Sequence, residues 1–290
     1  MRMEFSKMHG CGNDYVYVNC MDSELPNPEA ISEYVSHRQF GIGADGLILI
    51  MPSEKADFRM RMFNADASEG KMCGNGTRCV AKYVYDNGLT DKTTITLETL
   101  SGIKTIDMTV VDGKVTEATV DMGEPIFKTK EIPMISDHFV FMDQGLVIDE
   151  DLTYNGTAVS MGNPHFVIFV EDVDAIKLEE IGPRIEHHHL FPERTNVEFV
   201  QVLDDNTVKF RVWERGSGET WACGTGACAV AVTSIFLNHA GKKDQELKVL
   251  VKGGELKITY KSDNHVLLKG PATHVFDGVI EIPEAIINKI

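Results

Sequence analysis

Two cysteines of this chain precede glycine-rich tripeptides, and an apolar run follows each of them. Cys73 stands before Gly-Asn-Gly, and Cys223 stands before Gly-Thr-Gly. The helical spacing of the apolar residues predicts a helix that begins at each glycine loop. Because the free N–H groups and the dipole of a helix N-terminus favour an anion, we expect both thiols to have a lowered pKa. Each thiol would then be available as a thiolate near neutral pH.

Two thiols of this kind are suited to proton transfer at carbon. A thiolate can remove a proton while a thiol on the opposite face delivers one, and inversion of a stereocentre requires a group on each side. General acid–base catalysis is most efficient when the pKa of the group lies near the working pH. The alternative is that both cysteines are buried structural residues at glycine turns, although packing alone does not explain matching glycines beside both.

The two cysteine loops belong to a longer internal repeat. Cys223 follows Cys73 by 150 positions, and the same offset relates other polar and glycine positions without a gap. The matching pairs are Gly12-Asn13 with Gly162-Asn163, Arg61 with Arg211, Phe63 with Trp213, and Glu69 with Glu219. The repeat predicts two similar halves, each with one thiol at a helix N-terminus, and a cleft between the halves across which the thiols face each other.

Other kinds of site fit the sequence less well. Neither loop has the Gly-Lys-Ser/Thr ending of a P-loop or the full Gly-x-Gly-x-x-Gly spacing of a dinucleotide site. Cys73 and Cys79 are too far apart for a Cys-x2–4-Cys zinc pair, and the histidines at 187–189 have no cysteine nearby, which favours a solvated loop. A thiol redox protein would more often use a Cys-x-x-Cys pair, which this sequence lacks. We therefore expect no metal site.

Composition and charge limit the possible partners and compartment. The chain has 290 residues, enough for one large or two ordinary domains, and a net charge of −16. That charge argues against a nucleic-acid surface and against binding to anionic membranes. The sequence contains no apolar run long enough to span a membrane and no apolar signal-peptide core at its start. Six cysteines are too few for a secreted disulfide scaffold, so we expect a cytoplasmic protein with reduced thiols.

The elements that must position the two loops follow from periodicity. Expected strands in the first half are Glu4–Met8, Tyr15–Val18, Leu47–Met51, Asp57–Phe63, Thr94–Glu98, Ile103–Val111 and Lys114–Asp121. Expected strands in the second half are Thr157–Ser160, His165–Val170, Val197–Leu203, Thr207–Glu214, Leu247–Lys252, Glu255–Tyr260 and His265–Lys269. Besides the helix after Cys73, expected helices are Pro28–His37, a segment near Asp172–Glu180, Gly226–Asn238 and Pro283–Ile290.

These elements predict an α/β (α+β) protein of two pseudo-symmetric domains. The helix at 226–238 is apolar almost all round, so it should be buried, with strands of a mostly antiparallel or mixed sheet wrapped around it. The stretch at 123–133 has two prolines and little periodicity and is the predicted boundary. The domains would be residues 1–123, joined by the C-terminal segment 275–290, and residues 124–274.

Several polar motifs resemble those of the diaminopimelate epimerase family over nearly the full length of the chain. The matching motifs are Lys7-Met8-His9-Gly10, Gly12-Asn13-Asp14, Phe63-Asn64-Ala65-Asp66, Cys73-Gly74-Asn75-Gly76-x-Arg78-Cys79, Gly162-Asn163-Pro164-His165, Thr195-Asn196-Val197-Glu198, Glu214-Arg215-Gly216-x-Gly218-Glu219-Thr220, Ala222-Cys223-Gly224-Thr225-Gly226 and Gly270-Pro271-Ala272-Thr273-His274-Val275. The resemblance implies conversion of LL-diaminopimelate to the meso form, for lysine and peptidoglycan precursors, by a homodimer that needs neither pyridoxal phosphate nor metal.

The resemblance also implies a role for individual residues. The residues matching Cys73 and Cys223 would be the two catalytic bases, and those matching His165 and Glu214 would adjust the thiol pKa values. Side chains that would hold the substrate match Asn13, Asn64, Asn163, Asn196, Glu214 and Arg215. Backbone groups that would grip the carboxylate at the reacting centre match Gly74, Asn75, Gly224 and Thr225.

Two positions depart from the family pattern, and one related function remains open. Gly46 stands where many members have glutamine, and Phe276 stands where many have a tyrosine linked to dimer contacts. A proline or hydroxyproline racemase of the same fold is the alternative. The asparagine set and Arg215 argue against it. Arg215 could bind a distant carboxylate with two hydrogen bonds, and a compact imino acid has no such carboxylate.

Overall fold

The computed structural model describes residues 1–289 and divides into two compact units. Unit 1 comprises Met1–Val120 together with the C-terminal segment from Gly270, and unit 2 comprises Asp121–Lys269. The two boundaries predicted from the sequence, at residues 123 and 274, lie a few residues later in the chain. Met122 N donates to Val266 O and Val266 N donates to Gly123 O, so residues 122 and 123 are tied to a strand of unit 2. No helix within residues 1–289 is both long enough and apolar enough to cross a membrane.

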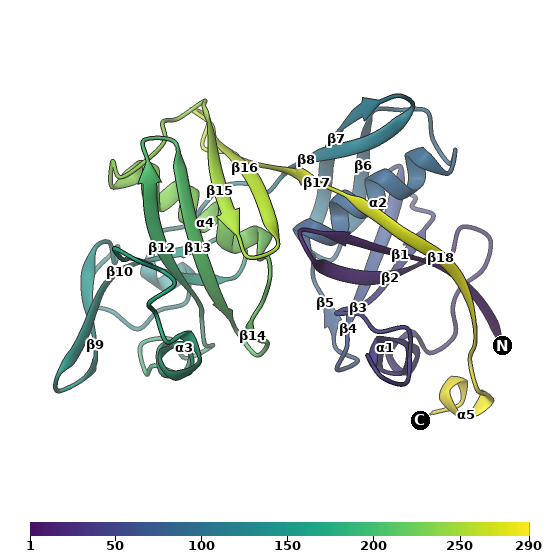
Figure 1. The fold of residues 1–290 in the computed structure, drawn as a ribbon, viewed down its shortest axis with the longest axis horizontal. Helices are drawn as coiled ribbons and strands as arrows, with labels where there is room; N and C mark the ends of the chain where they lie inside the picture. The colour runs from purple at the N-terminus through teal and green to yellow at the C-terminus, as the bar shows by residue number, and fades with distance from the viewer. Residues whose placement is uncertain (290) are drawn as a thin grey trace. The chain divides into compact units, whose positions relative to one another are not determined.

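Unit 1 is built from strands with a central helix (Figure 1). Strand β2 pairs in parallel with β3, β1 lies between β18 and β2, and β4 continues the order beside β3. The strands are β1 (Arg2–Gly10), β2 (Asn13–Asn19), β3 (Gly46–Met51), β4 (Phe58–Asn64), β5 (Glu69–Gly70), β6 (Thr94–Thr99), β7 (Gly102–Val111), β8 (Lys114–Asp121) and β18 (Thr273–Glu281). The helices are α1 (Pro28–Ser36), α2 (Gly74–Asp86) and α5 (Glu284–Ile287).

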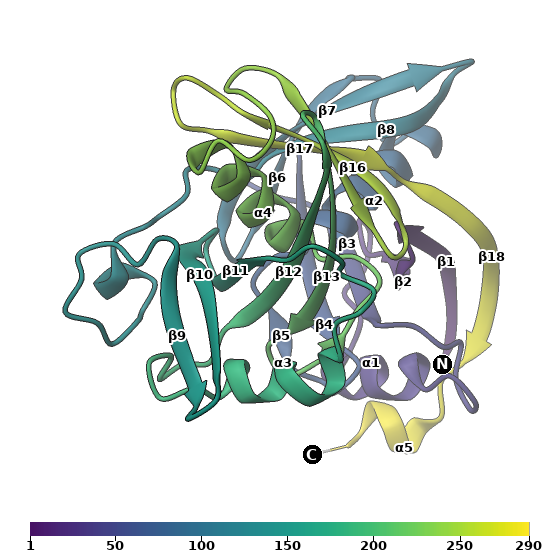
Figure 2. The same ribbon diagram turned by 60° about the vertical axis from the view of Figure 1, so that its left-hand side comes forward.

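Unit 2 repeats this plan. Strand β11 pairs in parallel with β12, and β13 follows beside β12 in antiparallel orientation. The strands are β9 (Gln144–Asp149), β10 (Leu152–Ser160), β11 (Pro164–Phe169), β12 (Asn196–Asp204), β13 (Thr207–Glu214), β14 (Gly218–Glu219), β15 (Glu246–Val251), β16 (Gly254–Tyr260) and β17 (Val266–Pro271). The helices are η1 (Thr129–Glu131), α3 (Leu178–Glu186) and α4 (Gly224–Phe236). Figure 2 shows α4 lying against the strands of this unit and α3 near the ends of β13 and β14.

The offset of 150 positions found in the sequence is kept in the register of the strands. The antiparallel pair Phe63–Glu69 in unit 1 corresponds to Trp213–Glu219 in unit 2. The ion pairs repeat as well: Arg61 Nε lies 2.7 Å from Glu69 Oε1, and Arg211 Nε lies 2.9 Å from Glu219 Oε1. The prediction of a mixed α+β chain of two pseudo-symmetric halves is confirmed.

The central helices provide much of the core. Helix α4 is buried at ten of its positions, as its all-round apolar sequence predicted. Helix α2 is buried from Gly74 through Ala81 and again at Val84. Burial of these helices fixes the loops at their N-terminal ends, since a helix enclosed on most sides cannot move without opening the core.

Several elements differ from the sequence prediction: β5, β9, β14, β18 and η1 were not predicted, β10 begins earlier than expected, and α3 is displaced. The helix expected near 172–180 runs instead from Leu178 to Glu186. Arg211 Nη1 donates to the carbonyl groups of Val173 and Ile176, which holds the preceding residues in turns. Strand β18 was not predicted, because its residues are mostly exposed on both faces and show no alternation of apolar and polar side chains.

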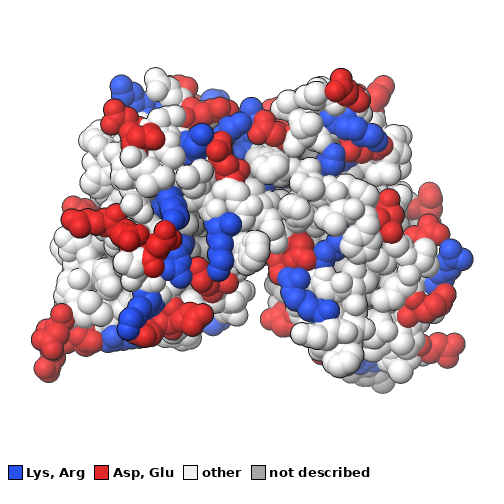
Figure 3. Space-filling view, viewed as in Figure 1, with Lys and Arg blue, Asp and Glu red and all other residues white. Residues whose placement is uncertain are grey.

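Charges of both signs are interspersed on the face drawn in Figure 3, over both units. A single continuous basic patch does not appear on that face.

Candidate functional site

Each unit holds one cysteine as the N-cap residue of its central helix. Cys73 caps α2 and Cys223 caps α4, both with extended backbone. The sulfur of Cys73 accepts the N–H of Gly76 at 3.3 Å, and the sulfur of Cys223 accepts the N–H of Gly226 at the same distance. The glycine loops therefore place both thiols at helix N-termini, as predicted from the sequence.

In unit 1, the thiol joins a cluster of two asparagines. Cys73 Sγ donates to Asn13 Oδ1 at 3.2 Å, and Asn75 Nδ2 donates to the same oxygen at 3.2 Å. Arg78, which is fully buried, donates from Nη2 to Asn75 Oδ1 at 3.0 Å and from Nη1 to Gly74 O at 3.2 Å. Of the predicted residues in this unit, Asn13, Cys73, Gly74 and Asn75 are thus brought together.

The remaining unit 1 predictions are placed differently. Asn64 Nδ2 donates to Ser68 Oγ at 3.0 Å, at the end of β4. Gly46 pairs with both Tyr15 and Asn64 in the sheet. A methyl group added at Gly46 would lie 2.1 Å from the Phe63 carbonyl oxygen, so this backbone leaves no room for a side chain.

In unit 2, a buried histidine–glutamate pair lies behind the thiol loop. His165 Nδ1 lies 2.7 Å from Glu198 Oε1, and neither side chain is exposed to solvent. The other ring nitrogen of His165 lies 3.0 Å from Asn163 Oδ1. The position of a methyl group at Gly226 would be 2.8 Å from Glu198 Oε1, so this carboxylate reaches the first turn of α4.

The thiol of Cys223 has an environment that opposes ionisation. Burial raises its pKa well above the ordinary value, and the negative charges of Glu214 and Glu198 raise it further. Hydrogen bonds from Thr225 and from the N–H of Gly226 act in the opposite direction but are outweighed. The lowered pKa expected from the helix N-terminus is therefore wrong for Cys223 in this state of the protein, because a buried thiolate loses more hydration than the helix end returns.

Glu214, at the end of β13, is a second titratable group beside the thiol of Cys223. Burial raises the pKa of its carboxyl group, whereas the Thr220 hydroxyl and His165 lower it. The Thr220 hydroxyl donates to Glu214 Oε1. Glu214 thus acts on the Cys223 thiol and His165 acts on Glu214, while the role of His165 and Glu214 in adjusting the thiol pKa values stays a prediction.

The loop that carries Arg215 is held by two polar side chains. Asn196 Oδ1 accepts the N–H of Arg215 at 2.9 Å, and Glu186 Oε1 accepts the N–H of Gly216 at 2.9 Å. The guanidinium group of Arg215 donates from Nη1 to Glu193 O at 3.0 Å. Arg215 itself is thus fixed through its backbone, while its charged end makes a bond to a carbonyl group that a carboxylate could replace.

Three carboxylates of the site were not predicted as functional residues: Asp45, Glu186 and Glu198. Glu186 is almost fully buried and accepts the indole N–H of Trp213 at 2.7 Å in addition to the loop N–H. Glu198 lies between Val197 and Phe199 in a buried strand, and a carboxylate within an apolar run is the signal that could have identified it. Within residues 1–289, no group of three or more His, Cys, Asp or Glu side chains is arranged to hold a metal ion.

Comparison with a solved structure identifies the class of fold. The chain aligns with a probable proline racemase from Agrobacterium radiobacter K84 with a TM-score of 0.72. The alignment covers 97% of this chain and 93% of that chain at 13% sequence identity. This likeness shows that the two chains share a fold.

Sequence relatives identify the family. The sequence model described as diaminopimelate epimerase matches residues 5–128 and 157–275. Proteins named diaminopimelate epimerase from Methanococcus maripaludis and Acetivibrio thermocellus are each 54% identical to this chain, over 97% of its length and 100% of theirs. The chain belongs to the diaminopimelate epimerase family, a family of isomerases.

Proposed function

We propose that this chain interconverts LL- and meso-diaminopimelate by a two-base mechanism in which Cys73 and Cys223 act on opposite faces of one α-carbon. The observation that carries the proposal is the repeated placement of the two thiols. Each caps the central helix of its unit, and each sulfur accepts an N–H from the first turn at 3.3 Å. A mechanism with one group on each face explains why the same device is present twice.

The α-proton of an amino acid is a very weak acid, so the developing negative charge must be stabilised. Backbone N–H groups at Gly74, Asn75, Gly224 and Thr225 belong to the first turns of the two helices. In our proposal, they bind the carboxylate at the reacting centre, where donors fixed in advance stabilise charge as an oxyanion hole does. The reaction would then need neither pyridoxal phosphate nor a metal.

The two thiols have different surroundings, which suggests how they divide the work. Because burial, Glu214 and Glu198 all favour the neutral form of Cys223, that residue is suited to deliver a proton. When the reaction runs in reverse, the Cys223 thiolate removes the α-proton of the substrate and so regains its own proton. Asn163, Asn196 and Asn64 would hold the polar groups of the substrate, and Arg215 would bind its distant carboxylate with two hydrogen bonds. That last contact would decide which α-carbon lies between the sulfurs.

Substitution of each thiol tests this proposal. Cys73→Ala and Cys223→Ala should each abolish epimerisation, because inversion needs a base and an acid. Cys20→Ala is the matched control, since Cys20 is a free buried cysteine outside both loops. Circular dichroism would follow loss of LL-diaminopimelate, with proline and hydroxyproline as competing substrates. Near-normal turnover by either loop variant would exclude the two-thiol mechanism, and a preference for proline would favour a racemase of the same fold.

We further infer that the protein is a cytoplasmic homodimer. Strand β18 exposes the apolar side chains of Val275, Phe276 and Val279, each by more than two fifths, which supports an interface on this strand. Phe276 could keep an apolar contact there but not the hydroxyl bond of a tyrosine. Light scattering on the purified protein should give twice the chain mass, and Phe276→Asp should give a monomer. A monomer at all concentrations for the unmodified chain would refute the interface.

A further inference from the structure

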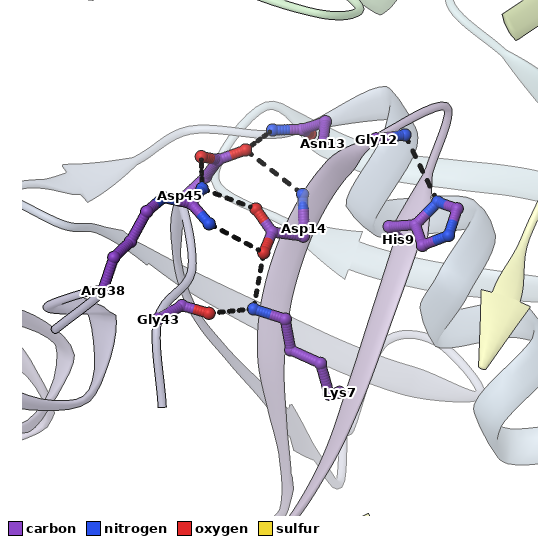
Figure 4. A network of polar contacts seen from close by, with 8 residues as sticks. All are labelled: Lys7, His9, Gly12, Asn13, Asp14, Arg38, Gly43 and Asp45. Carbon is purple, nitrogen blue, oxygen red and sulfur yellow. Dashed lines mark hydrogen bonds and ion pairs between the residues drawn. The ribbon is translucent and has the colours of Figure 1, made fainter. Parts of the chain in front are cut away.

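Asn13, which accepts the S–H of Cys73, also contacts a cluster of charged side chains. Figure 4 shows this cluster around Asn13. Asp45 Oδ2 accepts Asn13 Nδ2 at 2.8 Å and the backbone N–H of Asp14 at 3.1 Å. Arg38 Nη2 lies 2.8 Å from Asp45 Oδ1 and 2.9 Å from Asp14 Oδ1. Lys7, which is almost fully buried, pairs with Asp14 and donates to Gly43 O.

These contacts determine which end of the Asn13 amide faces the thiol. An ionised carboxylate can only accept hydrogen bonds, so Asp45 requires the NH2 group of Asn13 on its side. The Asn13 oxygen is then directed to the opposite side, where it accepts the S–H of Cys73 and the NH2 of Asn75. Reversing the amide would set its NH2 group against that of Asn75 and leave Asp45 facing an oxygen.

A second charged group confirms the direction from the other end. The guanidinium of Arg78 can only donate, and it donates to Asn75 Oδ1 at 3.0 Å. The NH2 group of Asn75 must therefore point to Asn13. Both amides are fixed by groups that have a single hydrogen-bonding sense, one acceptor at one end and one donor at the other.

We propose that Asp45, held by Arg38, is a positioning residue that orients the Asn13 amide so that its oxygen holds Cys73 as a neutral thiol in the substrate-free protein. The proposal rests on the proposed function for its meaning in catalysis, but the orientation itself is a property of the free protein. Substrate that binds Asn13 would compete for the same amide oxygen, and Cys73, with its S–H no longer held, would lose its proton to solvent and act as the thiolate base.

The ionisation of the cluster fits this role. Burial and the charge of Asp14 raise the pKa of Asp45, so its ionised form is costly to the fold. Burial acts in the same direction on Asp14, but hydrogen bonds from Arg38 and Lys7 lower the pKa of that carboxyl group. The two cations thus stabilise the ionised form of Asp14. For Asp45, the contact that most clearly stabilises the ionised form is the hydrogen bond from Asn13.

Alkylation of Cys73 by iodoacetamide tests the orientation without any assay of turnover. In Asp45→Ala the Asn13 amide loses its fixed partner and its oxygen holds the S–H of Cys73 less firmly, so we expect Cys73 to react about five- to tenfold faster. Asp45→Asn can keep an oxygen toward Asn13 while it loses the ion pair with Arg38, so it should stay within about threefold of the unmodified rate. Mass spectrometry of the modified peptides would separate Cys73 from Cys223.

Asp57→Ala is the matched control. Asp57 accepts the N–H and the hydroxyl of Thr96 and pairs with Lys92 in the same unit, with no contact to Asn13. It should leave the reactivity of Cys73 unchanged. A comparable rate increase in Asp57→Ala would show that the change reflects loosening of the unit.

A double-mutant cycle then tests the path of the effect. If Asp45 acts through Asn13, Asp45→Ala should change kcat/KM and Cys73 alkylation less than twofold in an Asn13→Ala background. The proposal would be overturned if the effects of Asp45→Ala and Asn13→Ala multiplied fully in the double mutant. It would also be overturned if Asp45→Ala left the alkylation rate of Cys73 unchanged, or if Asp45→Ala and Asp45→Asn changed that rate equally. Absence of epimerisation by the unmodified chain would refute the proposed function instead, while the alkylation results would still decide the orientation.

Discussion

Gly76 and Gly226 occupy the same position in the first turn of the two central helices, but their surroundings differ. A methyl group at position 226 would lie 2.8 Å from Glu198 Oε1 and 3.2 Å from Cys223 Sγ. A methyl group at position 76 would meet the end of the Ile48 side chain at 2.6 Å, and the sulfur of Cys73 only at 3.7 Å. Gly226→Ala and Gly76→Ala are therefore a matched pair of identical substitutions.

The difference in cost follows from what must move. At position 226, the Glu198 oxygen must retreat by about 0.6 Å to reach an ordinary contact of 3.4 Å, and it is bound to His165 at 2.7 Å in a site closed to solvent. Disturbing a buried hydrogen bond of a charged group costs about 1.5–3 kcal/mol, and alanine returns up to about 1 kcal/mol of helix propensity. At position 76, the flexible end of Ile48 can rotate away, so that cost and gain nearly cancel.

Thermal unfolding and epimerase kinetics would measure both effects. We expect Gly226→Ala to lower the Tm by about 1–8 °C and to reduce kcat at least about tenfold, while Gly76→Ala leaves the Tm within about 1 °C of the unmodified protein. A crystal structure of Gly226→Ala should show a longer distance between His165 and Glu198. Equal behaviour of the two variants would refute the claim that Glu198, held by His165, excludes a side chain at position 226.

Three further substitutions test the carboxylates and the arginine of unit 2. Glu186→Gln should raise KM for diaminopimelate about three- to tenfold with little change in kcat, because an amide cannot accept the N–H of Gly216 and its other donors equally well; an unchanged KM would remove Glu186 from substrate positioning. Glu214→Gln should speed alkylation of Cys223 about tenfold, since a nearby negative charge raises the pKa of that thiol. Glu214→Gln should also raise the Tm at neutral pH but not below about pH 4.5. The raised pKa of the Glu214 carboxyl group destabilises the fold only where that group is ionised. A Tm gain that persists at acid pH would contradict this cause. Arg215→Lys should weaken substrate binding about tenfold or more in calorimetry, as one ammonium group does not replace a two-bond grip, and normal binding would exclude the distant-carboxylate role.

The sequence predicted the parts of this fold that depend on local pattern. The glycine loops after Cys73 and Cys223, the burial of α4 and the repeat at 150 positions all reflect periodicity or residue type, and all are found in the structure. Strand β18 could not be predicted in this way, since its mostly exposed residues carry no two-residue alternation. The start of α3 was also misplaced, because the turns before it depend on bonds from Arg211, a residue far along the chain.

The chemistry of the site depended more strongly on tertiary structure. A helix N-terminus predicts a lowered thiol pKa, but the burial of Cys223 and its approach to Glu214 and Glu198 reverse the direction. Neither effect is visible in a sequence, because the carboxylates come from β12 and β13. Asp45 and Glu186 were missed for the same reason, since an isolated carboxylate in a sequence does not reveal which backbone or amide group it holds.

Solvent deuterium tests the two-base proposal most directly. The protein would be incubated with LL-diaminopimelate in D2O, and the α-protons of substrate and product would be followed by NMR at low conversion. Two thiols on opposite faces predict that the first meso product carries deuterium at the inverted α-carbon while the remaining LL substrate still carries protium. Early product that retains the original proton, or substrate that exchanges as fast as product forms, would contradict a mechanism with one thiol on each face.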